Sequence, residues 1–307
     1  MLQQDPRHYQ ILFLSLFLIL GIWTRDWTLR PDLILVAIAT CLLTQWIAIS
    51  NGSKLKVIIL NLLIKKQDYP EKDKTNLSDS PNWSSLKSAT ITALSLSLLL
   101  RADHWTTIVL AGSLAISSKF LFQVKGKHFF NPANFGIIAA LLLTNDAWVS
   151  PGQWGDDGWY ALVFAGTGGI VLNRVGRWDT TAAFLGAYAL LEAIRNFWLG
   201  WTWDVYFHRL MSGSLLLFAL FMITDPRSIP NRRSSRLIWA TCIAVLTFIL
   251  RNHFFISTAV FWALFALAPL SIVLDFIWSG TRFTWTQASS DAKNFDIEAN
   301  VEAVRIS

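Results

Sequence analysis

The chain has 307 residues, of which 53% are hydrophobic and 15% are charged, with a net charge of +6 and a mean hydropathy of +0.43. Soluble domains carry about 25% charged residues, so this composition excludes an ordinary soluble protein and predicts a polytopic membrane protein. In a soluble protein the basic balance would suggest nucleic acid. In a membrane protein it reflects Lys and Arg retained on the cytoplasmic side, and we expect the lipid bilayer, and no nucleic acid, as a partner.

Apolar runs recur along almost the whole chain and predict about ten transmembrane helices, because one span needs about 20 mostly apolar residues. The expected ranges are Tyr9–Trp23, Asp32–Ser50, Leu86–Leu100, Trp105–Phe122, Ala133–Val149, Trp159–Asn173, Thr180–Leu199, Phe207–Thr224, Leu237–Leu250 and Ile256–Trp278. No small-residue cleavage site follows the first run, which predicts a retained helix and not a signal peptide. The expected fold class is an all-α polytopic membrane protein.

These helices are expected to form a single transmembrane domain over residues 1–279, with halves of about 1–150 and 151–279. Residues 51–87 are the long polar insert and predict a cytoplasmic loop. Residues 280–307 are polar and predict a cytoplasmic tail. Most of the 26 Lys and Arg residues fall on one side of this arrangement, so the positive-inside rule puts both termini in the cytoplasm. We expect a multi-pass protein of the plasma (inner) membrane.

A short repeated motif suggests internal symmetry. His128-Phe129-Phe130 precedes the fifth predicted helix, and His253-Phe254-Phe255 precedes the tenth. Two copies that lie five helices apart would face opposite sides of the membrane, because five is an odd number. The motif therefore predicts two five-helix inverted repeats, an arrangement in which binding sites often lie between the halves.

The segment from Lys125 to Gly136 joins two of the longest apolar runs and begins with basic residues. Pro132 is suited to the first turn of a helix, and Asn131 is suited to cap it. The start of a helix also favours an anion. This pattern predicts a site for a phosphate-bearing ligand; the alternative is a well-capped helix start with ordinary cytoplasmic lysines.

Four ionisable residues at predicted membrane depth are candidates for an ion or proton path, because charge is costly there. They are Lys119, Glu192, Arg195 and Asp275. Each also has a structural explanation. Lys119 could extend to the surface, Glu192 and Arg195 are three residues apart on one helix and could form an ion pair, and Asp275 could be solvated at the interface.

Two further segments could bind a ligand. Asp225 begins a segment that carries an Arg cluster, and Arg clusters pair well with phosphate or acidic partners, although positive-inside bias also explains them. Gly168 and Gly169 would let a flat ligand or a neighbouring helix approach closely. Cys41 and Cys242 lie in apolar runs without the spacing of a metal site, and no catalytic constellation or metal site is expected.

Four segments together resemble the NqrB/RnfD family, the membrane subunits of sodium-pumping NADH:quinone oxidoreductase and of the related Rnf electron-transport complex. Gly126–Gly136 is similar to the start of that family's fifth helix, and Gly166–Gly169 to the start of its second half. Met222–Pro230 resembles its Thr-Asp-Pro segment. Leu267–Leu270, followed by Asp275, resembles the end of its last helix. The resemblance runs from about residue 118 to 278.

The resemblance implies a flavin site. Members with covalent FMN carry it on a Thr in the loop between helices five and six, and residues 149–158 contain no Thr. Covalent FMN is therefore not expected, as in reduced, UnbU-like relatives, and the expected cofactor is non-covalent FMN or riboflavin. The implied cofactor-binding residues are Lys127, His128, Asn131, Pro132, Asn134, Gly136, Gly168, Gly169, Thr224, Asp225 and Arg227.

The function implied by the resemblance is that of an integral membrane subunit of a redox-driven electron-transport or ion-translocating complex, with other membrane redox subunits as partners. In such a complex the chain would be a non-catalytic or flavin-carrying subunit. Two alternatives remain open: a cofactor-free transporter of a small solute or ion, and a membrane scaffold for a cytoplasmic enzyme.

Overall fold

The structure is a computed structural model that describes residues 5–24, 30–50, 83–150 and 158–283. Most of the predicted loop 51–87 and of the predicted tail 280–307 lies outside the described residues. The described residues of the first half form five helices. They are α1 (Arg7–Thr24), α2 (Pro31–Ser50), α4 (Trp83–Leu99), α5 (Trp105–Leu121) and α6 (Pro132–Leu143).

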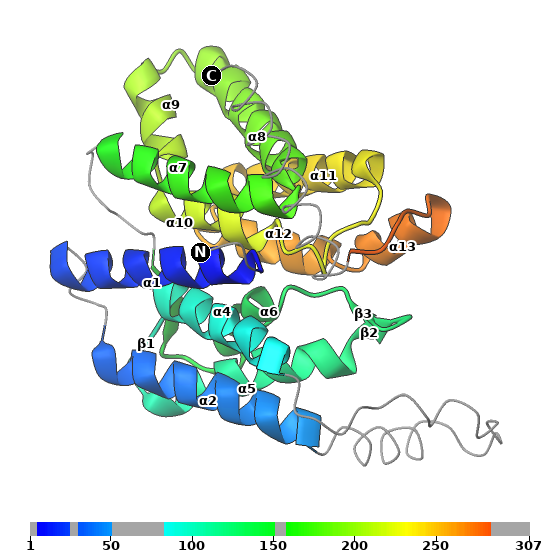
Figure 1. The fold of residues 1–307 in the computed structure, drawn as a ribbon. Coiled ribbons are helices and arrows are strands. Elements are labelled where there is room, and N and C mark those ends of the chain that lie inside the picture. The colour runs from blue at the N-terminus through cyan, green and yellow to red at the C-terminus, as the bar shows by residue number, and fades with distance from the viewer. Residues whose placement is uncertain (1–4, 25–29, 51–82, 151–157, 284–307) are drawn as a thin grey trace, which may run out of the picture.

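The second half repeats this pattern of long helices with two of them bent. Its elements are α7 (Gly158–Val175), α8 (Trp178–Trp198), α9 (Trp203–Leu210), α10 (Gly213–Leu217), the π-helix η2 (Phe218–Met222), α11 (Arg233–Asn252), α12 (Ala259–Leu267) and α13 (Leu270–Ile277). Figure 1 shows the two halves stacked, with α1 along the boundary between them.

Two short antiparallel strand pairs connect helix ends. β1 (Leu100–Ala102) pairs with β4 (Ala147–Val149), and Leu100 lies opposite Val149. β2 (Gln123–Val124) and β3 (Lys127–His128) form a hairpin. Its two turn residues, Lys125 and Gly126, have φ angles of 51° and 74°, the left-handed conformation that a tight two-residue hairpin turn requires.

Each predicted helical range overlaps a helix of the structure, but three ranges need correction. The fifth helix ends at Leu143, because Asp146 accepts hydrogen bonds from the backbone N–H of His104 and the hydroxyl of Thr107, and the next residues pair as β4. The eighth range is bent by 51° between α9 and α10, and the tenth by 43° between α12 and α13. Pro269 lies at the second bend, where its missing N–H interrupts the helix.

The long apolar helices make this an all-α membrane protein, apart from the two small strand pairs. By length and composition α2 and α11 can each cross a bilayer, and the described residues contain up to 4 spans if each bent pair counts as one. Helices α1, α4, α5 and α6 are apolar but shorter. The count of ten transmembrane spans stays a prediction.

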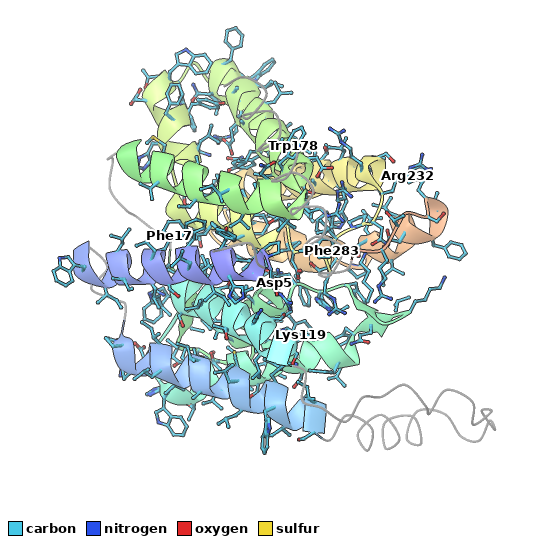
Figure 2. The ribbon with its side chains drawn as sticks, in the orientation of Figure 1. Asp5, Phe17, Lys119, Trp178, Arg232 and Phe283 are labelled. Carbon is cyan, nitrogen blue, oxygen red and sulfur yellow. The ribbon has the colours of Figure 1, made fainter. Side chains whose placement is uncertain are left out.

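Aromatic rings join the two halves. Phe17 of α1 lies edge to face with Phe221 of η2, with ring centroids 5.9 Å apart (Figure 2). Phe130, before α6, stacks on Phe265 of α12 at 5.0 Å. Buried aromatic rings carry large apolar area, so these contacts hold the halves against each other. The candidate site lies beside them.

Candidate functional site

Lys127, on β3, is held by residues of the second half. Its ammonium lies 2.7 Å from Oδ2 of Asp275 on α13, and 3.2 Å from Oδ1 of Asn231. Asn231 also donates to both carboxylate oxygens of Asp275, from its backbone N–H and its side-chain amide. Burial lowers the pKa of Lys127 although Asp275 opposes that change. Two residues that were predicted for separate roles therefore form one ion pair.

His128, next in the chain, faces Asp225 in the segment after η2. Nε2 of His128 lies 3.6 Å from Oδ2 of Asp225, and the imidazole is almost fully buried. Burial lowers the pKa of His128, more than the Asp225 carboxylate raises it. Burial raises the pKa of Asp225, but the hydrogen bond and charge of His128 outweigh it and hold that pKa below its usual value. At neutral pH the pair is a neutral imidazole beside a carboxylate.

The start of α6 is anchored by two asparagines. Oδ1 of Asn131 accepts from the backbone N–H of Asn134 at 3.0 Å and caps the helix that Pro132 begins, as the residue types predict. The side-chain amide of Asn131 donates to the carbonyl of Met222, and that of Asn134 donates to the carbonyl of Phe261. Oδ1 of Asn134 is buried and has no hydrogen-bond partner among the described residues.

A polar cavity of about 60 Å³ lies at this junction. Thr224 and Asp225 line it from one half, and Asn131 and Pro132 from the other. Its other polar lining residues are Arg7, Gln10, Ser88, Thr92 and Ser95. This volume holds a few water molecules, whereas pockets that enclose drug-sized ligands measure about 300–1,000 Å³. The cavity therefore favours water or a small ion over a flavin ring.

Lys119 of α5 lies near α4 (Figure 2). The residue is buried, and its ammonium donates to the backbone carbonyl and the hydroxyl of Ser88 on α4, both at 3.3 Å. Ser88 itself lines the cavity. Of the two alternatives left open for Lys119, extension of its side chain to the surface does not agree with this burial. Arg7 and Ser88 were not predicted, because single polar residues in apolar helices give no distinct sequence signal.

The predicted glycines differ in their surroundings. A Cβ on Gly136 would lie 2.6 Å from the carbonyl oxygen of Ala111, so this glycine lets α6 pack closely on α5. A Cβ on Gly168 would contact the side chain of Leu220 at 2.8 Å. Gly169 faces open space on the outside of α7. Gly136 and Gly168 thus serve helix packing, and Gly169 does not face the junction cavity.

The pair predicted between Glu192 and Arg195 is wrong. Glu192 is buried and accepts from Arg209 at 3.2 Å and from the amide of Asn252 at 2.8 Å. The guanidinium of Arg195 instead lies over the ring of Trp201, 4.6 Å from its centroid. Helix spacing predicted that the partner of Glu192 would lie on the same face of its own helix. The structure instead places Arg209 of α9 and Asn252 of α11 beside it. This network is far along the chain from the residues of the junction and shares none of them.

Members of the Arg cluster after Asp225 have different surroundings. Arg236 is buried and pairs with Asp179 of α8 at 2.6 Å. Arg233 lies 3.7 Å from the same carboxylate and over the ring of Trp178. Arg227 is exposed, and its backbone N–H donates to Asp225. Part of the cluster therefore holds α8 against α11, a structural role that the sequence did not predict.

A larger cavity of about 270 Å³ lies between the β2–β3 hairpin and α13. Its basic lining residues are Lys125, Lys127 and Arg282, and Phe129 and Phe276 supply aromatic rings. The guanidinium of Arg282 donates to the carbonyls of Lys125 and Gly126 and so ties the end of the described chain to the hairpin. Arg282 was not among the binding residues predicted from the sequence.

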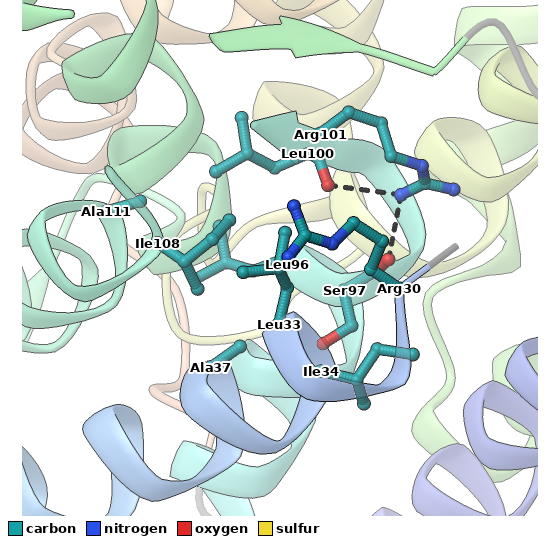
Figure 3. A pocket seen from close by; sticks show the side chains of 10 residues that line it. All are labelled: Arg30, Leu33, Ile34, Ala37, Leu96, Ser97, Leu100, Arg101, Ile108 and Ala111. Carbon is teal, nitrogen blue, oxygen red and sulfur yellow. Dashed lines mark hydrogen bonds between the residues drawn. The ribbon is translucent and has the colours of Figure 1, made fainter. Parts of the chain in front are cut away.

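A third cavity, between α2, α4 and α5, is small. It measures about 20 Å³ and is lined mainly by apolar side chains (Figure 3). Arg101 lies at its edge and donates to the carbonyls of Ser97 and Leu100. A space of this size holds at most one or two water molecules. It offers no site for an organic ligand.

Part of the chain matches known proteins. Residues 149–279 match the sequence model of the NQR2, RnfD, RnfE family. This part of the chain is similar to that family. The family resemblance predicted from the residues is thereby confirmed, although the hairpin and the start of α6 lie outside the matched range.

The related proteins are each named as a subunit of an ion-translocating oxidoreductase complex. The one from Vibrio vulnificus strain YJ016 is 34% identical over 96 residues, 31% of this chain and 27% of the relative. The one from Vibrio atlanticus strain LGP32 is 36% identical over 97 residues, with the same two shares. The one from Actinobacillus pleuropneumoniae serotype 5b strain L20 is 28% identical over 100 residues, 32% of this chain and 29% of the relative. These matches span less than a third of each relative's length.

Proposed function

We propose that this protein is an integral membrane subunit of a redox-driven, ion-translocating complex of the NqrB/RnfD type. The observation that carries the proposal is the family match over residues 149–279, together with relatives named as subunits of an ion-translocating oxidoreductase complex. The partners are then the other membrane redox subunits of that complex. The chain's own role would be to form part of the path for the ion through the membrane.

The packing of the helices supports the proposed two five-helix inverted repeats. In the first half α2 packs on α5 and α5 on α6; in the second half α8 packs on α11 and α11 on α12. α6 and α12, the helices that follow the two His-Phe-Phe motifs, contact each other at the centre. We propose ten spans, with both termini in the cytoplasm and the inner membrane as the location.

The junction cavity is the best candidate for part of the ion or proton path. It lies between the halves, and Asp225 is the carboxylate that lines it. Arg7 also lines it, His128 contacts Asp225, and Lys119 donates to Ser88 of the lining. Four ionisable side chains therefore line or adjoin a space that can hold water. Asp275 supports this region through Lys127. Glu192 and Arg195 belong to a separate network.

A non-covalent flavin, FMN or riboflavin, remains part of the proposal. It is supported by the contact of His128 with Asp225, and by Asn131, Thr224 and Asp225 lining one cavity. The cavity in its present form is too small to bind a flavin. A flavin ring enters this junction only when the elements that line the cavity move apart, because the present space of about 60 Å³ is too small for it.

The function is tested in the native host. A tagged chain is purified in mild detergent, and membrane vesicles with and without the gene are tested for an ion gradient driven by an electron donor. Co-purified redox subunits, and a gradient that needs the chain, are the expected results. Solute flux by the purified chain alone in liposomes would favour the transporter. Capture of a soluble enzyme without either activity would favour the scaffold.

The flavin is tested separately on the purified chain. Its visible spectrum is recorded, and the protein is then precipitated with acid. Flavin in the supernatant at close to one per chain is the expected result. Flavin in the pellet would mean covalent attachment, against the prediction from residues 149–158. A protein without flavin in either fraction would leave the subunit as a carrier of ions only.

A further inference from the structure

We propose that the cavity between the β2–β3 hairpin and α13 binds the headgroup of an anionic phospholipid. The inference goes beyond the proposed function, because it requires neither electron transfer nor a partner subunit. The cavity has a volume of about 270 Å³ and is formed by segments from the two halves of the chain. Figure 1 shows the hairpin and α13 projecting on the same side of the molecule.

The charge of the cavity is positive. Asp275 is the carboxylate in the lining, and the ammonium of Lys127 already neutralises it at 2.7 Å. Lys125 and Arg282 are left as two cationic side chains without a carboxylate beside them among the described residues. The exposed ammonium of Lys125 has no hydrogen-bonding partner in the described part of the chain, so it is free to bind a phosphate.

The surface beside this charge is apolar. Val273, Phe276 and Ile277 of α13 are 50%, 83% and 58% exposed, and Val124 of the hairpin is 38% exposed. Phe276 also lines the cavity itself. A soluble anion would leave these side chains in contact with water, whereas the acyl chains of a lipid would cover them. An anionic head with apolar chains therefore fits both parts of this surface.

The place of the cavity agrees with this ligand. Under the proposed topology the hairpin and the end of α13 lie at the cytoplasmic face, where anionic lipids give the membrane a negative surface potential. Trp278, directly after α13, is partly exposed, as is common for Trp at the membrane interface. The space admits a phosphate-bearing headgroup and leaves the acyl chains outside.

Native mass spectrometry of the full chain in mild detergent tests the proposal, with phosphatidylglycerol and phosphatidylcholine as probes. The expected result is one phosphatidylglycerol retained at lipid concentrations where phosphatidylcholine is lost. The double variant Lys125→Gln/Arg282→Gln should bind phosphatidylglycerol about 10- to 30-fold more weakly, since each basic residue at a membrane surface contributes about a factor of five to attraction.

The control variant Arg30→Gln/Arg195→Gln removes the same charge away from the cavity. Arg30 pairs with the exposed Asp32, and Arg195 lies over Trp201, so neither contacts the hairpin or α13. This control should keep wild-type binding. The single variant Lys125→Gln replaces an exposed side chain and keeps the contacts of Arg282, so it reports on lipid binding if the double variant folds poorly.

Four outcomes would overturn the proposal. Equal retention of the two lipids would mean binding through the apolar chains without selection of the headgroup. Equal losses in the cavity and control variants would mean general attraction to charge. Displacement of the lipid by millimolar inorganic phosphate would mean a site for the free anion. Displacement by FMN would assign the cavity to the flavin. The spectrum of the purified chain remains an independent test of the redox role, so failure here leaves that role standing.

Discussion

The ammonium of Lys127 lies 2.7 Å from the carboxylate of Asp275, and this pair joins the hairpin of the first half to α13 of the second. The two side chains are only 13% and 19% exposed. Removing one partner of a partly buried pair leaves the other charge poorly solvated, and that cost usually exceeds the net contribution of the pair itself. The interaction between Lys127 and Asp275 is therefore best measured by comparing variants of one partner with a variant of both.

We expect Lys127→Met to lower the free energy of unfolding by about 2 kcal/mol, less than for a fully buried pair, because Asn231 still donates to Asp275. The double variant Lys127→Met/Asp275→Asn should lose less than the sum of the single variants, since no unpaired charge remains. Unfolding in detergent, followed by Trp fluorescence, measures both. Additive losses would mean that the two side chains do not interact.

Gly136 and Gly169 offer a matched pair of substitutions to Ala. A methyl group on Gly136 would lie 2.6 Å from the carbonyl oxygen of Ala111 and 2.9 Å from the Cβ of Ala115, so α5 and α6 must separate. We expect a loss of about 1–3 kcal/mol in stability. Gly169→Ala meets no atom within 4 Å and should be neutral, or stabilising by up to about 1 kcal/mol. Thermal unfolding of the two variants, measured side by side, checks this contrast, and a stable Gly136→Ala protein would contradict the close packing.

Local features of the structure followed from the sequence. The start of α6 is an example, because the cap by Asn131 and the position of Pro132 depend only on neighbouring residues. The family motifs also indicated that the segments with Lys127, Asn131 and Asp225 belong to one site, and these segments do meet. The extent of the cavity between them could not be predicted, because it depends on the packing of apolar helices that carry little positional information.

Sequence rules did not predict contacts between residues that lie far apart in the chain. Glu192 and Arg195 satisfy the spacing of a helical ion pair, yet Glu192 contacts Arg209 and Asn252 from two other helices. A buried carboxylate takes the donors that the tertiary packing places nearest, and helical periodicity contains no information on those. Arg282 was missed for the same reason, since its contact with the hairpin spans more than half of the chain.

The Glu192 network predicts unequal effects for its two predicted members. Glu192→Ala leaves Arg209 and Asn252 without their shared acceptor, and we expect a loss of about 2–3 kcal/mol. Arg195→Gln removes one cation–π contact with Trp201 and should cost about 1 kcal/mol or less. Unfolding of both variants in detergent measures which substitution lowers stability more. If Arg195→Gln were as damaging as Glu192→Ala, a direct ion pair between them would have to be reconsidered.

The burial of His128 predicts that acid destabilises the protein. Its pKa in the folded state lies below the ordinary value of 6.5, so the unfolded chain binds a proton at a pH where the folded chain does not. Stability contributed by the neutral imidazole is therefore present above pH 6.5 and is lost as the pH falls below 6.5 toward the folded pKa. The pKa of Asp225 is lowered from 3.8, chiefly by His128 against the opposing effect of burial, so its contribution is present above pH 3.8 and is lost as the pH falls below that value.

The variant His128→Asn removes this titration. We expect the unfolding temperature to fall less between pH 7 and pH 5.5 in the variant than in the wild-type protein, because the buried imidazole that resists protonation is gone. His104→Asn is the control, because His104 is exposed and its contact to Asp146 is made by the backbone N–H, which the substitution keeps. Parallel pH profiles for the wild-type and His128→Asn proteins would show that His128 titrates alike in the folded and unfolded chains, and would contradict its buried position against Asp225.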